Sequence, residues 1–170
     1  MRIHALTADD TDPLPALGRL LQQAVDGGAS LGFLAPLARA DADAYWHGVF
    51  SQLGPLLQLW IAEDDGQLLG TVQLARCGKP NGRHRGEVQK LMVAPASRGR
   101  GVARRLMEAL ETAARADGLR LLVLDTQQGS DADAVYHHLG WERAGQIPCF
   151  AASPCGELMP TVLFYKLLAP

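Results

Sequence analysis

The sequence lacks the features of several large classes of protein. Its only cysteines are Cys77, Cys149 and Cys155, which are too few and too scattered for a disulfide framework and form no C-x-x-C pair. No run of about 18 apolar residues is present that could cross a membrane as a helix. The opening stretch MRIHALTADD also lacks the apolar segment of a secretion signal. We therefore expect a cytoplasmic protein with no membrane partner.

A large excess of charge of one sign is absent as well. The 170 residues include 16 Lys and Arg against 18 Asp and Glu, for a formal net charge of −2, so we expect no nucleic-acid partner. Hydrophobic residues make up 48% of the chain and charged residues 20%, a composition typical of a globular protein. The length suits one domain, and we expect a single domain over residues 1–170.

The hydrophobic pattern predicts a mixed α/β sheet. Helical spacing and end signals predict helices at residues 7–25, 40–53, 102–117 and 131–139. Alternating or continuous apolar runs predict strands at residues 3–6, 56–64, 67–76, 87–95, 119–126, 141–147 and 161–168. Hairpins come first and strand–helix–strand crossovers follow. This order predicts one parallel pair, formed by residues 87–93 and 119–125.

Arginines and glycines gather in the segment APASRGRGVARRLMEAL, where a predicted strand gives way to a helix. Gly99 and Gly101 allow successive backbone N–H groups to converge on an anion, the helix start adds its dipole, and the arginines add full charge. We interpret residues 98–103 as a pyrophosphate site, and the alternative is a glycine-rich turn with solvated arginines. The P-loop pattern is absent, and no G-x-G-x-x-G follows a strand near the N-terminus.

The spacing Arg98-x-x-Gly101-x-Ala103 resembles the [QR]-x-x-G-x-[GA] acetyl-CoA signature of GNAT-type N-acetyltransferases, and the order of elements is similar over the whole chain. The blocks GGASLGF, KPNG, EVQKLMVAPASRGRG and LDTQQGS resemble, within that family, the tabtoxin-resistance acetyltransferases, which acetylate the amine of an amino-acid toxin. The sequence departs from them at Ala103 and in HHLGWERAG. The resemblance implies the GNAT acyl-CoA N-acyltransferase fold, a mixed, mostly antiparallel sheet of about seven strands flanked by four helices.

The resemblance also implies where acetyl-CoA binds. The residues assigned to it are Leu91, Met92, Val93, Arg98, Gly99, Arg100, Gly101, Val102 and Ala103. In the family, a bulge within the strand at residues 91–93 frees a backbone N–H that polarises the thioester carbonyl, and the pantetheine arm pairs with the same strand. No metal is expected, because the five histidines share no spacing for a metal site.

Three side chains are candidates for catalysis. Glu87 begins one strand of the predicted parallel pair and Asp125 ends the other, so both carboxylates could border one cleft and take a proton from an ammonium group. The resemblance implies these roles, and it makes Tyr136 the general acid for the CoA sulfur. The alternatives are that Glu87 pairs with Arg85 or Lys90, that Asp125 caps the following turn, and that Tyr136 is a core aromatic residue.

These observations predict an enzyme that moves an acetyl group from acetyl-CoA to a small-molecule amine by direct attack in a ternary complex. An amino-acid-like compound, toxin or antibiotic is the expected acceptor, and the loop GGASLGFLAPL is expected to cover it. A covalent route through Cys149 or Cys155 is disfavoured, because no His–Asp pattern accompanies them. A protein or peptide acceptor and a non-catalytic acetyl-CoA sensor remain as alternatives. The resemblance also allows a homodimer, which is common in the family.

Overall fold

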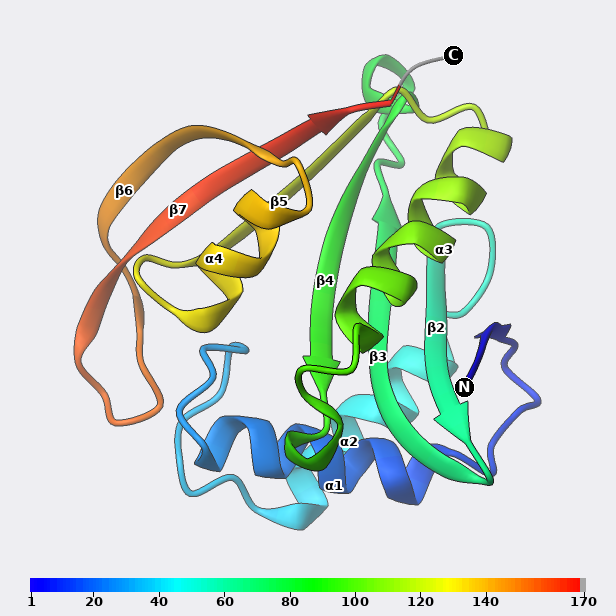
Figure 1. Ribbon diagram of the computed structural model, residues 1–170, viewed down its shortest axis with the longest axis vertical. Helices are drawn as coiled ribbons and strands as arrows, with labels where there is room; N and C mark the ends of the chain where they lie inside the picture. The colour runs from blue at the N-terminus through cyan, green and yellow to red at the C-terminus, as the bar shows by residue number, and fades with distance from the viewer. Residues whose placement is uncertain (169–170) are drawn as a thin grey trace.

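The computed structural model describes residues 1–168, which form a twisted open sheet with helices on both faces (Figure 1). The elements in chain order are β1 (Arg2–Leu6), α1 (Leu14–Asp26), α2 (Arg39–Phe50), β2 (Leu57–Asp64), β3 (Gln67–Arg76), β4 (Arg85–Val93), α3 (Val102–Ala116), β5 (Leu121–Gln127), α4 (Asp131–His138), β6 (Glu142–Ala152) and β7 (Leu158–Leu167). Short 3₁₀ turns at Pro80–Gly82 and Pro95–Ser97 precede and follow β4. The predicted order of helices and strands is confirmed.

Within the described residues the sheet has seven strands in the order β1-β2-β3-β4-β5-β7-β6. Its neighbouring strands are antiparallel except for β4 and β5, as predicted. The parallel pairing joins only Arg85–Leu121, Gly86–Leu122 and Glu87–Val123, which is shorter than the sequence predicted. Beyond these pairs the two strands diverge, as the view in Figure 1 makes plain. The divergence opens the sheet between β4 and β5.

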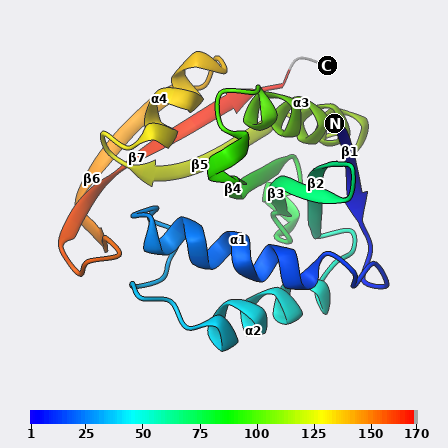
Figure 2. The same cartoon turned by 60° about the horizontal axis from the view of Figure 1, so that its bottom comes forward.

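The sheet separates two hydrophobic cores, with α1 and α2 covering one face and α3 and α4 the other (Figure 2). Leu106 and Leu110 of α3 pack in one core with Val88 of β4. Leu17 of α1 and Trp46 of α2 pack in the other core. Because the central strands are covered on both faces, most of their residues are apolar. This apolar pattern is the feature from which the strands were predicted.

A bulge interrupts β4. Gln73 of β3 faces Gln89, and Thr71 faces Met92, so one residue of β3 lies opposite two residues of β4, Lys90 and Leu91. Lys90 has the left-handed φ of 51° that accompanies this irregularity. The extra residue shifts the alternation of side chains, so residues after the bulge point to the opposite face from the one their sequence spacing predicts. Val88 therefore packs in the core under α3, whereas Met92, an even number of positions later, packs in the core under α1 and α2.

The largest differences from the predicted boundaries lie in the first helix and the last hairpin. The first helix begins at Leu14, because the Asp10 carboxylate accepts the Thr7 N–H at 2.8 Å and holds the preceding residues in a turn. The last hairpin is longer than predicted. The prediction was too short because every residue of β6 except Ala152 is exposed, so the strand carries no apolar alternation that would mark its length. No helix in the described part of the chain is long and apolar enough to span a membrane.

Candidate active site

The loop from β4 to α3 leaves backbone donors free and space in front of them. Gly99 and Gly101 have φ of 72° and 74°, and a Cβ added at either would meet nothing within 4 Å. Gly101 caps α3, whose first hydrogen bond runs from the Arg105 N–H to the Gly101 carbonyl at 3.1 Å. The N–H groups of residues 102–104 therefore have no acceptor within the helix. Free donors, a helix dipole and open space fit the pyrophosphate of coenzyme A.

The side chains predicted to bind the cofactor are of two kinds: exposed arginines, and buried or half-buried residues at the start of α3. Arg98 and Arg100 are exposed, and the Arg100 guanidinium lies 3.6 Å from Asp64. Val102 is buried in the core and holds the start of α3 against the sheet, whereas Ala103 is half-buried. An exposed pair at 3.6 Å is weak, so Arg100 is free to turn toward a phosphate.

The end of β4 offers one free edge for an extended ligand. Met92 and Val93 pair with Thr71 and Gly70 of β3. On the other edge, β5 follows β4 only as far as Glu87. A strand edge without a neighbour can accept an added extended chain, which is the arrangement predicted for pantetheine along residues 91–93. The bulge at Lys90 and Leu91 lies at the start of this free edge.

The two predicted carboxylates lie where β4 and β5 separate. Glu87 is the last residue of β4 that pairs with β5, and its partner there is Val123. Asp125 follows Val123 by two residues and so lies on the same face of β5. Gln89 Nε2 donates to Glu87 Oε1 at 2.8 Å, and the Thr161 hydroxyl donates to Asp125 Oδ2 at 2.9 Å. Both residues are exposed at the opening.

The competing structural roles for these carboxylates are not observed. Over residues 1–168 neither Glu87 nor Asp125 forms an ion pair. The turn after β5 is held instead by Ser130, which accepts the Asp133 N–H at 3.3 Å, and by Asp133, which accepts the Gly129 N–H at 2.9 Å. Glu87 and Asp125 are therefore available to a ligand at the opening between the strands.

Lys90 also lies at the site. The sequence analysis named it only as a possible ion-pair partner of Glu87. Its Nζ donates to the Leu31 carbonyl at 2.9 Å and lies 6.0 Å and 5.5 Å from the ring centres of Phe33 and Tyr45. Burial lowers the pKa of Lys90, while the charges of Asp125 and Glu87 oppose that shift. Lys90 thus ties the loop between α1 and α2 (residues 27–38, the α1–α2 loop) to β4. No sequence signal marks it, since a lysine in a strand usually faces solvent.

Tyr136 on α4 is both a core residue and a neighbour of Asp125. It is 6% exposed, and its ring centre lies 6.0 Å from that of Trp141 and 5.9 Å from that of Phe164. Burial raises the pKa of Tyr136 far above its ordinary value, and the charge of Asp125 adds to the rise. The phenol is therefore protonated at neutral pH, which a general acid requires.

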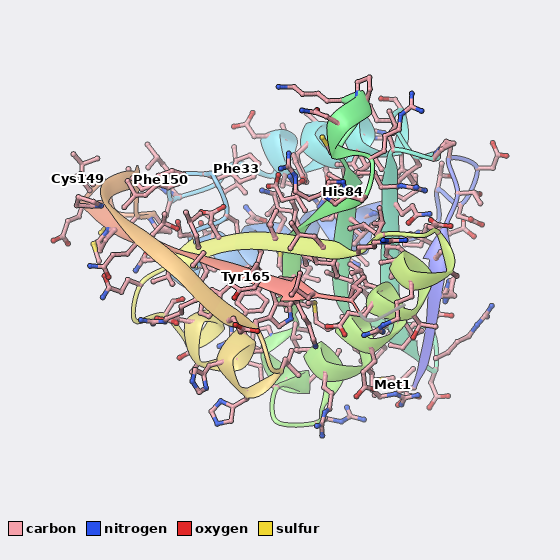
Figure 3. All side chains as sticks on the ribbon, turned by 90° about the horizontal axis from the view of Figure 1, so that it is seen from above. Met1, Phe33, His84, Cys149, Phe150 and Tyr165 are labelled. Atoms are coloured by element: carbon pink, nitrogen blue, oxygen red, sulfur yellow. The ribbon has the colours of Figure 1, made fainter. Side chains whose placement is uncertain are left out.

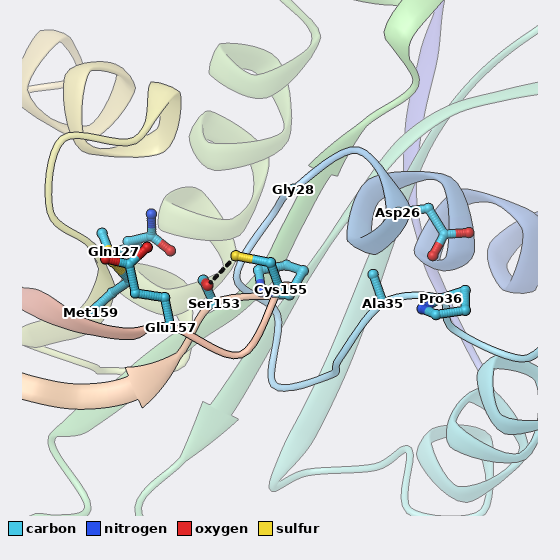
Figure 4. A pocket seen from close by; sticks show the side chains of 10 residues that line it. Asp26, Gly28, Ala35, Pro36, Gln127, Ser153, Cys155, Glu157 and Met159 are labelled. Atoms are coloured by element: carbon cyan, nitrogen blue, oxygen red, sulfur yellow. Dashed lines mark hydrogen bonds between the residues drawn. The ribbon is translucent and has the colours of Figure 1, made fainter.

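A cavity of about 750 Å³ lies beyond Asp125, between the α1–α2 loop and the turn joining β6 to β7 (residues 153–157, the β6–β7 turn) (Figure 4). The two walls meet where the Ala35 N–H donates to the Pro154 carbonyl at 2.9 Å. Viewed from above, Phe33 of the loop and Phe150 of β6 lie on the same side of the molecule (Figure 3). The sequence predicted the loop as one wall and missed the β6–β7 turn, which carries no recognisable motif.

The other proposed chemistries find little support in the site. Cys155 in the cavity wall lies 3.0 Å from the Ser153 hydroxyl, and that contact is with a hydroxyl group rather than a histidine (Figure 4). Cys149 is exposed on β6. Within residues 1–168, no group of three or more His, Cys, Asp or Glu side chains is placed to hold a metal ion.

The chain is similar in sequence to known acetyltransferases. The model of the acetyltransferase (GNAT) family matches residues 20–141. An uncharacterized N-acetyltransferase from the hisH–hisA intergenic region of Azospirillum brasilense is 37% identical over 107 residues. Those residues make up 62% of this chain and 62% of the relative, so the chain covers less than two thirds of that protein's length.

Solved structures share the fold. The ribosomal-protein-alanine N-acetyltransferase of Brucella melitensis has a TM-score of 0.78 at 22% identity, over 99% of this chain and 100% of that one. The protein yncA of Salmonella typhimurium, solved with its cofactor acetyl-CoA, has a TM-score of 0.77 at 20% identity, over 100% of this chain and 96% of that one. At these identities the likeness shows a common arrangement of helices and strands.

Proposed function

The chain belongs to the acetyltransferase (GNAT) family, whose members take an acetyl group from acetyl-CoA, and on that premise we propose that it acetylates the amine of a small molecule. One observation carries this proposal. The opening between β4 and β5 brings together two unpaired carboxylates, a free strand edge and the cavity beyond Asp125. We extend the proposal to a single catalytic domain over residues 1–170.

The cofactor is assigned to residues whose geometry fits it. The free N–H groups at the start of α3, with Arg98 and Arg100, would hold the pyrophosphate. The free edge at residues 91–93 would pair with the pantetheine arm. Acetyl-CoA supplies the thioester, and we assign the hydrogen bond to its carbonyl oxygen to a backbone N–H of residues 91–93, next to the irregularity in β4.

Proton transfer is assigned to the side chains at the opening. Glu87 and Asp125 attract the cationic acceptor and take one proton from its ammonium group, directly or through a water molecule. The free amine then forms a C–N bond to the acetyl carbon as the C–S bond breaks, and as the amide forms it gives a second proton to water at the opening, which balances the proton that Tyr136 donates. The Tyr136 hydroxyl gives a proton to the departing thiolate. Direct attack in a ternary complex needs no covalent enzyme intermediate, and among residues 1–168 the cysteine side chains contact Arg85 and Ser153 rather than a histidine.

A small acceptor is favoured by the walls of the cavity. The hydrogen bond from Ala35 to Pro154 joins the α1–α2 loop to the β6–β7 turn, and this connection obstructs an extended peptide. Amino-acid-like amines, and toxins or antibiotics that carry such an amine, are the first acceptors to test. A peptide acceptor would require the two walls to separate.

The experiment is to measure the release of free CoA from acetyl-CoA with a library of small amines and a matched set of peptides. Turnover with small amines that exceeds turnover with peptides supports the proposal. Tight binding of CoA without release for any amine would instead identify a sensor, and preferred turnover of peptides would identify a protein or peptide acetyltransferase.

A further inference from the structure

A hydroxyl group from the neighbouring strand holds Asp125 at the opening. Thr161 on β7 and Asp125 on β5 are diagonal neighbours on one face of the sheet, because Thr161 pairs with Gln127, two positions after Asp125. Thr161 Oγ1 donates to Asp125 Oδ2 at 2.9 Å, and over residues 1–168 no hydrogen bond is made to the other oxygen, Oδ1. One carboxylate oxygen is therefore fixed, and the other is left to a ligand.

Thr161 is rigid, whereas Asp125 is not. Thr161 is 3% exposed, and its strand lies between β5 and β6, with which it pairs at Gln127 and Ile147. Branching at Cβ restricts its side chain further. Asp125 is exposed, and an exposed carboxylate turns among several rotamers unless a partner fixes it. The hydrogen bond to Thr161 therefore limits the orientations of the Asp125 carboxylate.

The Thr161 hydroxyl has a second acceptor within reach. Its oxygen lies 2.9 Å from the Thr126 carbonyl as well, although a hydroxyl carries only one proton to donate. Hydrogen bonds to an ionised acceptor are the stronger, so the proton points to Asp125 while that carboxylate is charged. When Asp125 is protonated, the hydroxyl can turn to the Thr126 carbonyl and offer its oxygen to the carboxyl O–H. Both protonation states of Asp125 therefore find a partner in Thr161, which suits a group that gains and loses a proton in each turnover.

Glu87 has a different environment. Its partner, the Nε2 atom of Gln89, can only donate, and it belongs to an exposed residue pair two positions apart on one strand. Asp125 also acts on the proposed acid. Burial raises the pKa of Tyr136 and the charge of Asp125 adds to the rise, with no contribution from Glu87. These differences favour Asp125 as the carboxylate that takes the proton.

We propose that Thr161 is a positioning residue of the reaction, which holds Asp125 as the group that takes the proton of the acceptor ammonium, while Glu87 stays ionised. This inference rests on the proposed function and adds to it a residue and a distinction between the two carboxylates. In the transfer an N–H bond of the ammonium breaks, its electron pair stays on nitrogen, and the proton bonds to Asp125, which later releases it to water. The Thr161 hydroxyl turns and keeps its own proton throughout.

The test measures CoA release from acetyl-CoA with the small amine that has the highest turnover in the library. Thr161→Val keeps nearly the same shape and removes the hydroxyl, so we expect kcat to fall by about tenfold, with KM for the amine and the affinity for CoA within about twofold of the parent. Thr161→Ser keeps the hydroxyl and should hold kcat within about threefold of the parent. In an Asp125→Asn background, Thr161→Val should lower kcat by less than about twofold, because the two residues act as a unit.

Thr71 on β3 provides a matched control. It is 0% exposed, and its hydroxyl also donates to a backbone carbonyl, that of Trp60, at 2.9 Å. Thr71→Val therefore removes a buried hydroxyl from the same sheet without removing a partner of Asp125. Thermal unfolding should show a similar fall in Tm for the two valine variants, and only Thr161→Val should lose kcat.

The outcomes separate the inference from the proposed function. A parent-like kcat in Thr161→Val, or a loss that persists in Thr161→Ser or in the Asp125→Asn background, overturns the positioning role and leaves the acetyltransferase in place. An equal loss of kcat in Thr71→Val overturns it too, because the effect would then come from any buried hydroxyl of the sheet. Absence of CoA release with every amine overturns the proposed function and with it the role of Thr161.

Discussion

Replacing Gly101 by alanine tests whether the loop before α3 holds the cofactor. The residue has φ of 74°, so a side chain there is strained by about 1 kcal/mol even though its Cβ has open space around it. In a domain of this size that strain lowers Tm by about 2–4 °C. The same Cβ would stand in the space assigned to the pyrophosphate, and the shifted backbone would misplace the N–H groups at the start of α3.

The chain contains a matched control for this substitution. Gly118, just after the other end of α3, has φ of 77°, is exposed, and also has nothing within 4 Å of an added Cβ. Gly118→Ala should therefore cost the same stability as Gly101→Ala without touching a ligand. Loss of one hydrogen bond to a charged phosphate costs about 1.5–3 kcal/mol, so only Gly101→Ala should weaken CoA binding, by about tenfold or more.

Thermal unfolding and isothermal titration with CoA measure the two quantities separately. The expected result is an equal fall in Tm for both variants and a fall in CoA affinity for Gly101→Ala alone. Equal CoA affinity in the two variants would refute the assignment of the pyrophosphate to this loop. An unequal fall in Tm would show that the open space around one of the glycines was misjudged.

Three further predictions concern single side chains. Glu87→Gln and Asp125→Asn should each lower kcat by about tenfold or more, with CoA affinity within about twofold of the parent; unchanged rates in both would remove them from catalysis. Tyr136→Phe should keep the core packing and Tm but lower kcat, and a parent-like kcat would leave Tyr136 a core residue only. Lys166→Met removes an ammonium that lies 2.8 Å from one oxygen of the buried Glu111 carboxylate, while Arg115 stays 3.5 Å from the other oxygen, so urea unfolding should show a loss of about 2 kcal/mol, and a loss below about 0.5 kcal/mol would contradict a stabilising role for Lys166.

How well each helix or strand could be predicted from the sequence depended on how many of its faces are buried. The helix α3 and the strand β5 carry strong apolar patterns because they pack on the sheet or lie inside it, and both were located from sequence. The β2–β3 hairpin was marked by its turn, where Asp65 and Gly66 adopt φ of 47° and 75°. The hairpin β6–β7 was underestimated, because an exposed strand has no apolar alternation to reveal its length.

The residues of the candidate site also differ in how far their positions could be predicted from the sequence. Glu87, Asp125 and the loop at residues 98–103 were proposed from local pattern, because the sequence predicted each at a strand end or a helix start. The structure begins β4 at Arg85 and ends β5 at Gln127, so the two carboxylates lie within their strands, at the point where the strands separate. The contact of Lys90 with Leu31 joins residues 59 positions apart, and it depends on a bulge and on the path of a loop. Neither feature has a local sequence signal. The cavity wall in the β6–β7 turn was missed for the same reason.

The bulge in β4 links the two halves of the proposed reaction. It turns Met92 into the core under α1 and α2, places the Leu91 amide at the start of the free strand edge, and directs the Lys90 ammonium to the α1–α2 loop. One extra residue therefore positions both the group that would polarise the thioester and the loop that would cover the acceptor. Deleting Lys90 would restore a regular strand in which Met92, now three positions after Val88, keeps its side chain in the core under α1 and α2. The bulge beside the free strand edge and the contact with the α1–α2 loop would then be lost together, whereas replacing Lys90 by methionine would remove only the contact with the loop.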